Sequence, residues 1–351
     1  MSRYIGLMQS KNIVKISTDS PNHSKILTGI SGSGKSERKM DLERKAVLEG
    51  STVIEIDIDG SRPKDGGENY IFAQEEGLNL CLLEKPKRSD NTKLYYVNYI
   101  SSLLDVFSRI YFLGDRQKGA LREAIQFATK NRKDYSDDLE AIGGGLLESG
   151  TALSRGVYEK MWPVLKCGVF RRSSKAIQQG MINVISLENL PPSLQTACAE
   201  IFLNVFWKQI RENKYLREPV TIVIDEFQNL SVKKRSTLTD ILREGRKYKL
   251  DLLLSTQSLA VFSSDTIAAL NQAATRLYFR PSLSDVRKTA AEIDSQNQER
   301  WTLILKRLKV GEALSVGDFC INGRTVSKPI ITKTDYKREN KETYERRRFI
   351  E

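Results

Sequence analysis

The chain has 351 residues and a single histidine, His23. A zinc site with two histidine ligands and a histidine relay are therefore excluded, and away from His23 no Ser-His-Asp triad can form. The cysteines are scattered among apolar neighbours without a CxxC pair, which argues against a metal cluster or a disulfide framework. We expect reduced core residues of a cytosolic protein at all four positions, Cys81, Cys167, Cys198 and Cys320.

Long apolar runs are also missing. The most apolar long stretch, residues 95–113, is interrupted by Asp105 and Arg109. The first residues contain no continuous apolar segment of the kind found in signal peptides. The sequence therefore predicts neither a signal peptide nor a membrane-spanning helix.

The composition is that of a folded, basic protein. Apolar residues make up 40% of the chain and charged residues 28%, which is enough for a sizeable core. Lysine and arginine number 56 against 44 aspartates and glutamates, so the formal charge is +12. This excess favours a polyanionic partner, with ATP, nucleic acid and an acidic membrane surface all open at this point.

Short apolar runs alternate with longer helical patterns along the chain. This alternation predicts an α/β fold with a mostly parallel sheet. The candidate strands are Lys25–Thr28, Thr52–Ile58, Ile182–Leu187, Val220–Ile224, Leu250–Ser255, Thr275–Phe279 and Ala313–Val316. The clearest helices are Ser36–Leu48, Asp115–Thr129, Ser193–Arg211, Ser236–Lys247 and Leu283–Ile293.

The domain organisation follows from these elements. Residues 1–24 are predicted to form a small hairpin, and residues 25–60 and 180–332 an ATPase core. Residues 61–179 form a long, mainly helical insertion, in which Gly143, Gly144 and Gly145 mark a flexible connection. Residues 333–351 are a charged tail with few apolar side chains, for which a solvated end is the simplest interpretation.

The sharpest motif is the sequence GISGSGKS at residues 29–36, which fits GxxxxGK[ST] between an apolar strand and a helical pattern. Glycines let the backbone wind around phosphates and point its N–H groups at them, and the following helix adds positive potential. Lys35 is expected to reach the β and γ phosphates, and the Ser36 hydroxyl to ligate Mg²⁺. The residues expected to hold the nucleotide are Gly29, Ser31, Gly32, Ser33, Gly34, Lys35 and Ser36.

A second acidic strand end is needed to hold the metal and activate water. The apolar run 221–224 ends in Asp225 and Glu226, which are the expected Mg²⁺ partner and the expected general base. The alternative is an apolar strand that simply ends in acidic turn residues. The presence of the GKS motif favours the catalytic interpretation.

The next predicted strand ends in Ser255, Thr256 and Gln257. Parallel strands bring their carboxyl ends to one edge of the sheet, so Gln257 is expected beside Glu226, where it would sense or orient the attacking water. Arg246, at the basic end of the preceding helix, is a candidate arginine finger. From local physics alone, a cation that satisfies the helix dipole is the better explanation of Arg246.

Taken in order, these motifs resemble the HerA/FtsK superfamily of ring-forming DNA-pumping ATPases, and within it the conjugative type IV secretion ATPases. The resemblance spans roughly residues 26–332. It rests on Asn22-His23 before the GKS loop, Asp225-Glu226, the run from Arg243 to Gln257, Asn271–Arg280, and Gly311-Glu312-Ala313-Leu314.

The resemblance implies a RecA-like P-loop core that uses ATP and Mg²⁺. It also implies that Arg246 acts on a neighbouring subunit, that Gln257 couples the γ-phosphate to subunit movement, and that the active form is a homohexamer. Only about 25 residues precede the P-loop strand, so we expect none of the N-terminal membrane helices or barrels of other members.

Two functions remain open from the sequence. The first is a ring motor that hydrolyses ATP and moves DNA without sequence preference, through basic loops such as residues 233–235 or the group Arg171, Arg172 and Lys175. For either basic group, a solvated surface is an equally good interpretation. The second is a nucleotide-switched scaffold that assembles with a secretion or defence partner protein and never moves DNA. For both we expect a cytoplasmic protein, and a place at the periphery of a membrane complex stays open in either case.

Overall fold

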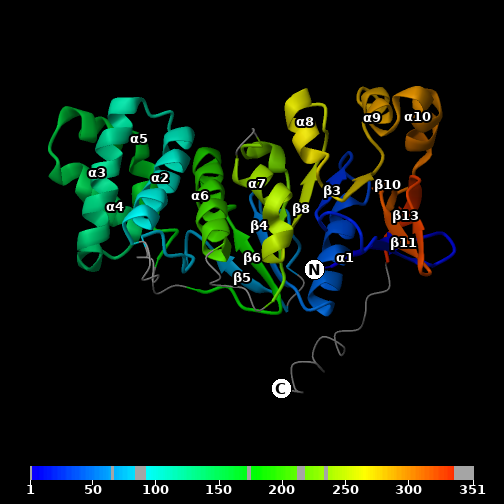
Figure 1. Ribbon diagram of the computed structural model, residues 1–351, viewed down its shortest axis with the longest axis horizontal. Helices are drawn as coiled ribbons and strands as arrows, with labels where there is room; N and C mark the ends of the chain where they lie inside the picture. The colour runs from blue at the N-terminus through cyan, green and yellow to red at the C-terminus, as the bar shows by residue number, and fades with distance from the viewer. Residues whose placement is uncertain are drawn as a thin grey trace, which may run out of the picture.

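The computed structural model describes residues 2–64, 67–83, 92–171, 175–211, 218–232 and 236–335, without the side chains of residues 92–96. The predicted basic loop at residues 233–235, Arg172 and most of the predicted tail lie outside these ranges. Within them, no helix combines the length and apolar character needed to cross a membrane. Figure 1 shows a long sheet with helices on its faces and a group of helices at one end.

The described strands form one thirteen-stranded sheet. In spatial order they are β12 (Arg324–Val326), β11 (Phe319–Ile321), β2 (Ile13–Ile16), β1 (Tyr4–Leu7), β13 (Ile330–Lys333), β10 (Glu312–Gly317), β9 (Thr275–Tyr278), β3 (Lys25–Thr28), β8 (Leu250–Thr256), β7 (Val220–Ile224), β4 (Thr52–Asp57), β6 (Ile182–Ser186) and β5 (Asn69–Phe72). From β9 to β5 the pairings are parallel, and the others are antiparallel. The predicted α/β class with a mostly parallel core is confirmed.

The central strands are buried on both faces, which is why they read as continuous apolar runs. On one face, Val223 of β7 packs with Leu42 and Ala46 of α1 (Lys35–Leu48). On the other, Ile222 and Ile224 belong to the core that includes α6 (Pro192–Arg211) and α7 (Thr237–Glu244). Because side chains alternate along a strand, odd-numbered residues of β7 face α1.

The long insertion supplies both helices and a strand. Helices α2 (Thr92–Ile110), α3 (Asp115–Asn131), α4 (Asp138–Glu148) and α5 (Ala152–Lys166) gather at one end of the molecule (Figure 1). Strand β5 precedes them and pairs with β6 as the last strand of the sheet. The insertion is therefore continuous with the sheet on which the core is built.

The expectation of a flexible connection at Gly143–Gly145 is wrong. All three glycines lie inside α4. A Cβ on Gly145 would lie 2.8 Å from the carbonyl oxygen of Ala124 in α3, and one on Gly144 would lie 2.3 Å from the hydroxyl of Tyr135. The glycines allow helices to approach closely, a role that the sequence pattern does not distinguish from a linker.

The C-terminal half of the core departs from the predicted helix bounds in two places. Helix α7 ends at Glu244 and is followed by a 3₁₀ turn, η3 (Gly245–Tyr248). A glycine is needed at the start of this turn, because a Cβ on Gly245 would lie 2.5 Å from the Leu250 carbonyl oxygen. The later helix begins at Val286 instead of Leu283, whose side chain is exposed. The remaining helices are α8 (Ser264–Leu270), α9 (Val286–Ile293) and α10 (Gln298–Arg307).

The cysteines are all free, but only Cys198 is buried. Cys167 is half-buried and packs against the main core. The expectation of a core position is wrong for Cys81 and Cys320, which are half-buried. Cys320 lies on β11, next to the edge strand β12, where cover is incomplete.

Candidate nucleotide site

The loop between β3 and α1, which carries the GKS motif, depends on its glycines. Gly29, Gly32 and Gly34 have φ values of 154°, 73° and 91°, which favour glycine. Side chains are excluded as well, since a Cβ on Gly29 would lie 2.6 Å from Phe279 Cβ and one on Gly34 would lie 2.5 Å from the Gly311 nitrogen. The N-cap residue of α1 is Gly34, which has no side chain with which to cap the helix, so the first N–H groups of α1 are available to an anion.

Four predicted site residues meet at the carboxyl ends of β3, β7 and β8. Lys35 Nζ, on the first residue of α1, lies 3.7 Å from Glu226 Oε1. The side-chain nitrogen of Gln257 donates a hydrogen bond to the same oxygen over 3.0 Å. Asp225 follows β7 and its side chain is largely buried, whereas Ser36 is exposed at the start of α1. The sheet therefore brings together residues that are up to 222 positions apart in the sequence.

Glu226 is held by two glutamines and by its own backbone. Its φ and ψ are both 46°, in the left-handed region that is costly for a residue with a side chain and is found at functional sites. Gln228 donates a hydrogen bond to Glu226 Oε2 over 2.6 Å, and Thr256 donates one to Gln228 Oε1 over 2.7 Å. Sequence reasoning missed Gln228, although its place two residues after Glu226 is a signal that could have identified it.

Asp225 is an ionised carboxylate in a buried position. Burial opposes its charge, but Lys39 Nζ at 2.8 Å, together with Lys35 and Ser255, outweighs this effect, so the pKa of Asp225 lies below its ordinary value. The carboxylate of Asp225, which follows β7, and the exposed hydroxyl of Ser36, the second residue of α1, are oxygen donors of the kind that Mg²⁺ accepts together with phosphates and water. The residues present therefore fit the predicted metal.

A third carboxylate at this edge was not predicted. Asp57 ends β4, and Ile56 pairs with Ile224, so Asp57 lies next to Asp225 in register. Burial raises the pKa of Asp57 to about 6, against the opposing effect of Lys39. The signal in the sequence was the acidic end of the strand at residues 52–58.

Arg38 of α1 connects the loop between β3 and α1 to neighbouring segments of the chain. Its side chain is fully buried and donates to the carbonyl oxygens of Ile5 at 2.8 Å and Gly311 at 3.2 Å, and to the hydroxyls of Thr332 and Thr334. Gly311 in turn donates its N–H to the Ser33 carbonyl oxygen over 2.9 Å. Arg38 thus links β1, β13 and the turn before β10 to the loop between β3 and α1, which is called the nucleotide loop below.

Arg246 lies near the amino end of β8, opposite the strand ends that carry Glu226 and Gln257. It is exposed on η3, before β8 begins, and donates a hydrogen bond to the Ser20 carbonyl oxygen over 2.8 Å. Burial and the charges of Lys25 and Arg246 lower the pKa of His23 to about 4, so His23 is neutral at pH 7. The seven residues of β8 separate Arg246 from Gln257, a span of roughly 23 Å. Arg246 therefore does not reach the nucleotide loop of its own chain.

Two members of the second predicted basic group, Arg171 and Lys175, make contacts within the protein. Lys175 Nζ lies 2.8 Å from Glu76 Oε1 and lowers the pKa of that carboxyl. Arg171 donates to the Glu75 carbonyl oxygen over 3.4 Å. These contacts weaken the case for this group as a DNA-binding loop.

Comparison with known proteins places the fold. No family model matches the chain. A curated relative, "Probable helicase MJ1565" of Methanocaldococcus jannaschii, is 22% identical over 370 aligned positions, which cover 94% of this chain and 66% of the relative. VirB4 of Thermoanaerobacter pseudethanolicus superposes with a TM-score of 0.71 at 17% identity, over 95% of this chain and 96% of that one. The chain has the fold of the HerA/FtsK-type P-loop ATPases.

A coupling protein of plasmid conjugation shares this fold. The bacterial conjugative coupling protein TrwBΔN70 superposes with a TM-score of 0.59 at 14% identity, over 91% of this chain and 85% of that one. TrwB in complex with ADP and Mg²⁺ gives 0.58 at 16% identity, over 90% and 86%. TrwB is also known in complex with a non-hydrolysable ATP analogue. The resemblance stated from the motifs is thus confirmed at the level of fold, and the expected ligands ATP and Mg²⁺ agree with the ligands of these TrwB complexes. The roles of individual site residues stay predictions.

Proposed function

We propose that the protein is an ATPase that hydrolyses MgATP at the carboxyl ends of β3, β7 and β8. The observation that supports this most strongly is the meeting of Lys35, Glu226 and Gln257 around one carboxylate oxygen, with contacts of 3.7 Å and 3.0 Å. A cation, a base and an amide within reach of one another beside a glycine-rich loop are the parts that phosphoryl transfer to water requires.

Each side chain has a role in this proposal. Lys35 neutralises charge on the β and γ phosphates, and Glu226 accepts the proton of the attacking water. Gln257 holds the Glu226 carboxylate and orients that water. Ser36 and Asp225 would hold Mg²⁺, which when bound stabilises negative charge on the phosphates.

We further propose that the chain works as a ring that moves DNA. Arg246 is exposed and separated from its own nucleotide loop by the length of β8, so an interface with a second copy is needed to bring it to a nucleotide. The resemblance of the motifs to DNA-pumping ATPases supports a DNA substrate, as does the formal charge of +12. Contact with phosphates would make DNA binding independent of sequence and sensitive to salt.

The second candidate is a nucleotide-switched scaffold for a secretion or defence complex, located in the cytoplasm beside a membrane complex. It shares the nucleotide site, so DNA is the variable that separates the two. We expect double- or single-stranded DNA to raise the steady-state ATPase rate of the full chain, with Lys35→Ala as the inactive control. Turnover that ignores DNA, together with ATP-dependent assembly, would favour the scaffold.

A further inference from the structure

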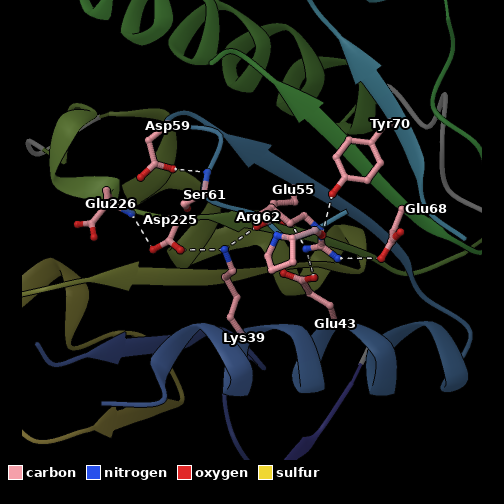
Figure 2. A network of polar contacts seen from close by, with 11 residues as sticks. Lys39, Glu43, Glu55, Asp59, Ser61, Arg62, Glu68, Tyr70, Asp225 and Glu226 are labelled. Carbon is pink, nitrogen blue, oxygen red and sulfur yellow. Dashed lines mark hydrogen bonds and ion pairs between the residues drawn. The ribbon is translucent and has the colours of Figure 1, made fainter. Parts of the chain in front are cut away.

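A buried ion network lies behind the nucleotide site (Figure 2). Lys39 Nζ lies 2.6 Å from Glu55 Oε1 and 2.8 Å from Asp225 Oδ2. The exposed fractions of the three side chains are 4%, 0% and 10%. Glu55 and Asp225 project from the neighbouring strands β4 and β7 toward α1, and Lys39 reaches them from that helix.

The network follows from the register of α1. Lys35, Lys39 and Glu43 are spaced four residues apart, so they share one face of the helix. Lys35 faces Glu226, and Lys39 faces the adjacent Asp225. The two acidic residues that end β7 are thus each paired with one lysine of the same helix.

Arg62 is the second cation of the network, and it binds the carboxylates that lie farther from Asp225. Arg62 Nη1 contacts both Glu43 and Glu55, and Arg62 Nη2 lies 3.6 Å from Glu68. Glu55 is therefore bound by Lys39 on one oxygen and by Arg62 on the other. Figure 2 shows these side chains side by side between α1 and the sheet. Lys39 is held at a fixed place even though its side chain is long.

The cost of this arrangement points away from a role in stability alone. Desolvation of each buried ion costs several kcal/mol, and well-packed apolar side chains of similar volume often stabilise a fold as well or better. Ionic contacts instead fix orientation. The two oxygens of Asp225 are both occupied, since Oδ2 accepts from Lys39 and Oδ1 accepts the N–H of Glu226 over 3.0 Å.

We propose that Lys39 is a positioning residue for Asp225: its ammonium group fixes one carboxylate oxygen, so that the carboxylate presents a set orientation to Mg²⁺ and its water shell. The proposal rests on the proposed function, in which Asp225 serves the Mg²⁺ of MgATP. Groups that orient a metal ligand from outside the coordination sphere are typically worth 10- to 100-fold in metal affinity.

Orientation and simple charge predict opposite results when Lys39 is removed. Loss of a positive charge 2.8 Å from Asp225 would strengthen Mg²⁺ binding if charge alone mattered. Loss of orientation would weaken it. The sign of the change therefore separates a positioning role from a passive countercharge.

The test measures binding of ADP to the full chain by calorimetry, in EDTA and over a series of Mg²⁺ concentrations. We expect Lys39→Met to raise the half-saturating Mg²⁺ concentration about 10- to 100-fold while ADP affinity in EDTA stays at the parent value. Lys45→Met is the matched control, because Lys45 is on the same helix and stacks over Tyr4. It should leave the Mg²⁺ dependence unchanged.

An unchanged or lower half-saturating Mg²⁺ concentration in Lys39→Met overturns the proposal, and so does an equal loss of ADP affinity in EDTA. If Lys39→Met does not fold because Glu55 is left buried with one cation, the double variant Lys39→Met with Glu55→Gln removes both charges and is measured in the same way. Failure of the parent chain to bind ADP at all would instead contradict the proposed function.

Discussion

Gln257 donates its amide hydrogen to Glu226 Oε1 over 3.0 Å. The two residues follow β8 and β7, which pair in parallel, so the contact joins two adjacent strand ends. A movement of either strand end would change the position of the carboxylate that is proposed to act on water.

Replacement of Gln257 by alanine should slow ATP hydrolysis while leaving nucleotide affinity intact. A hydrogen bond to a charged group is worth about 1.5–3 kcal/mol, which corresponds to roughly 10- to 100-fold in turnover. Steady-state ATPase assays and ADP titration measure the two quantities. Gln272→Ala, at an exposed turn, is the control. A loss of ADP affinity equal to the loss of turnover would contradict the role of Gln257.

Glu226→Gln should bind MgATP but hydrolyse it about 10²- to 10⁴-fold more slowly, because the base is lost and Asp225 remains. Single-turnover hydrolysis and equilibrium binding measure the effect. Turnover at the parent rate would show that another group, with Asp57 the nearest candidate in register, accepts the proton.

Arg246→Ala should bind ATP normally and lose up to roughly 10³- to 10⁵-fold in turnover, by analogy with other arginine fingers. The decisive measurement mixes Arg246→Ala chains with Glu226→Gln chains. One kind of interface then joins an intact base to an intact arginine, so part of the activity should return. If mixed assemblies form and stay inactive, Arg246 is the helix-end cation that local physics favours.

Asp57→Asn should stabilise the fold in a pH-dependent way. The pKa of Asp57 is raised to about 6 from an ordinary value of 3.8, so its contribution to stability is present below pH 4 and is lost as the pH rises through 6. The variant should therefore match the parent near pH 4 and exceed it above pH 6 by up to about 3 kcal/mol. Urea unfolding at several pH values measures this difference, with the exposed Asp115→Asn as control. An equal difference at every pH would rule the explanation out.

Arg38→Met should destabilise the fold by about 3 kcal/mol or more, since the carbonyl oxygens of Ile5 and Gly311 and two threonine hydroxyls lose a buried donor. Urea unfolding gives the value, and Arg44→Met on the same helix is the matched control, because Arg44 is only half-buried. A change below about 1 kcal/mol would show that the buried contacts rearrange.

Much of the sheet could be predicted because buried parallel strands have a strong local signature. The bounds of β3 and β7 coincide with the predicted Lys25–Thr28 and Val220–Ile224. Strands β11, β12 and β13 were not predicted, because short, partly exposed strands depend on their pairing partners more than on their own residues.

The site residues also divide into those with a local sequence signature and those that depend on packing between distant elements. Lys35, Asp225 and Glu226 follow from local motifs, and Gln257 from the rule that parallel strand ends meet. Lys39 was not identified, because its importance depends on the packing distance between α1 and two strands, and no short motif records that distance.

Arg246 lies near the amino end of β8, and Gln257 follows its carboxyl end. This separation has a consequence for assembly. If the arginine completes a second copy's site, the two contact surfaces are different patches of the molecule, so association is heterologous. Such a contact forms a closed ring when the rotation between copies divides the circle evenly, and an open filament otherwise. In an open filament the terminal copy at one end would hold a nucleotide without an arginine, and the terminal copy at the other would present an arginine with no nucleotide to serve. Ring closure would then be the condition under which every copy is complete.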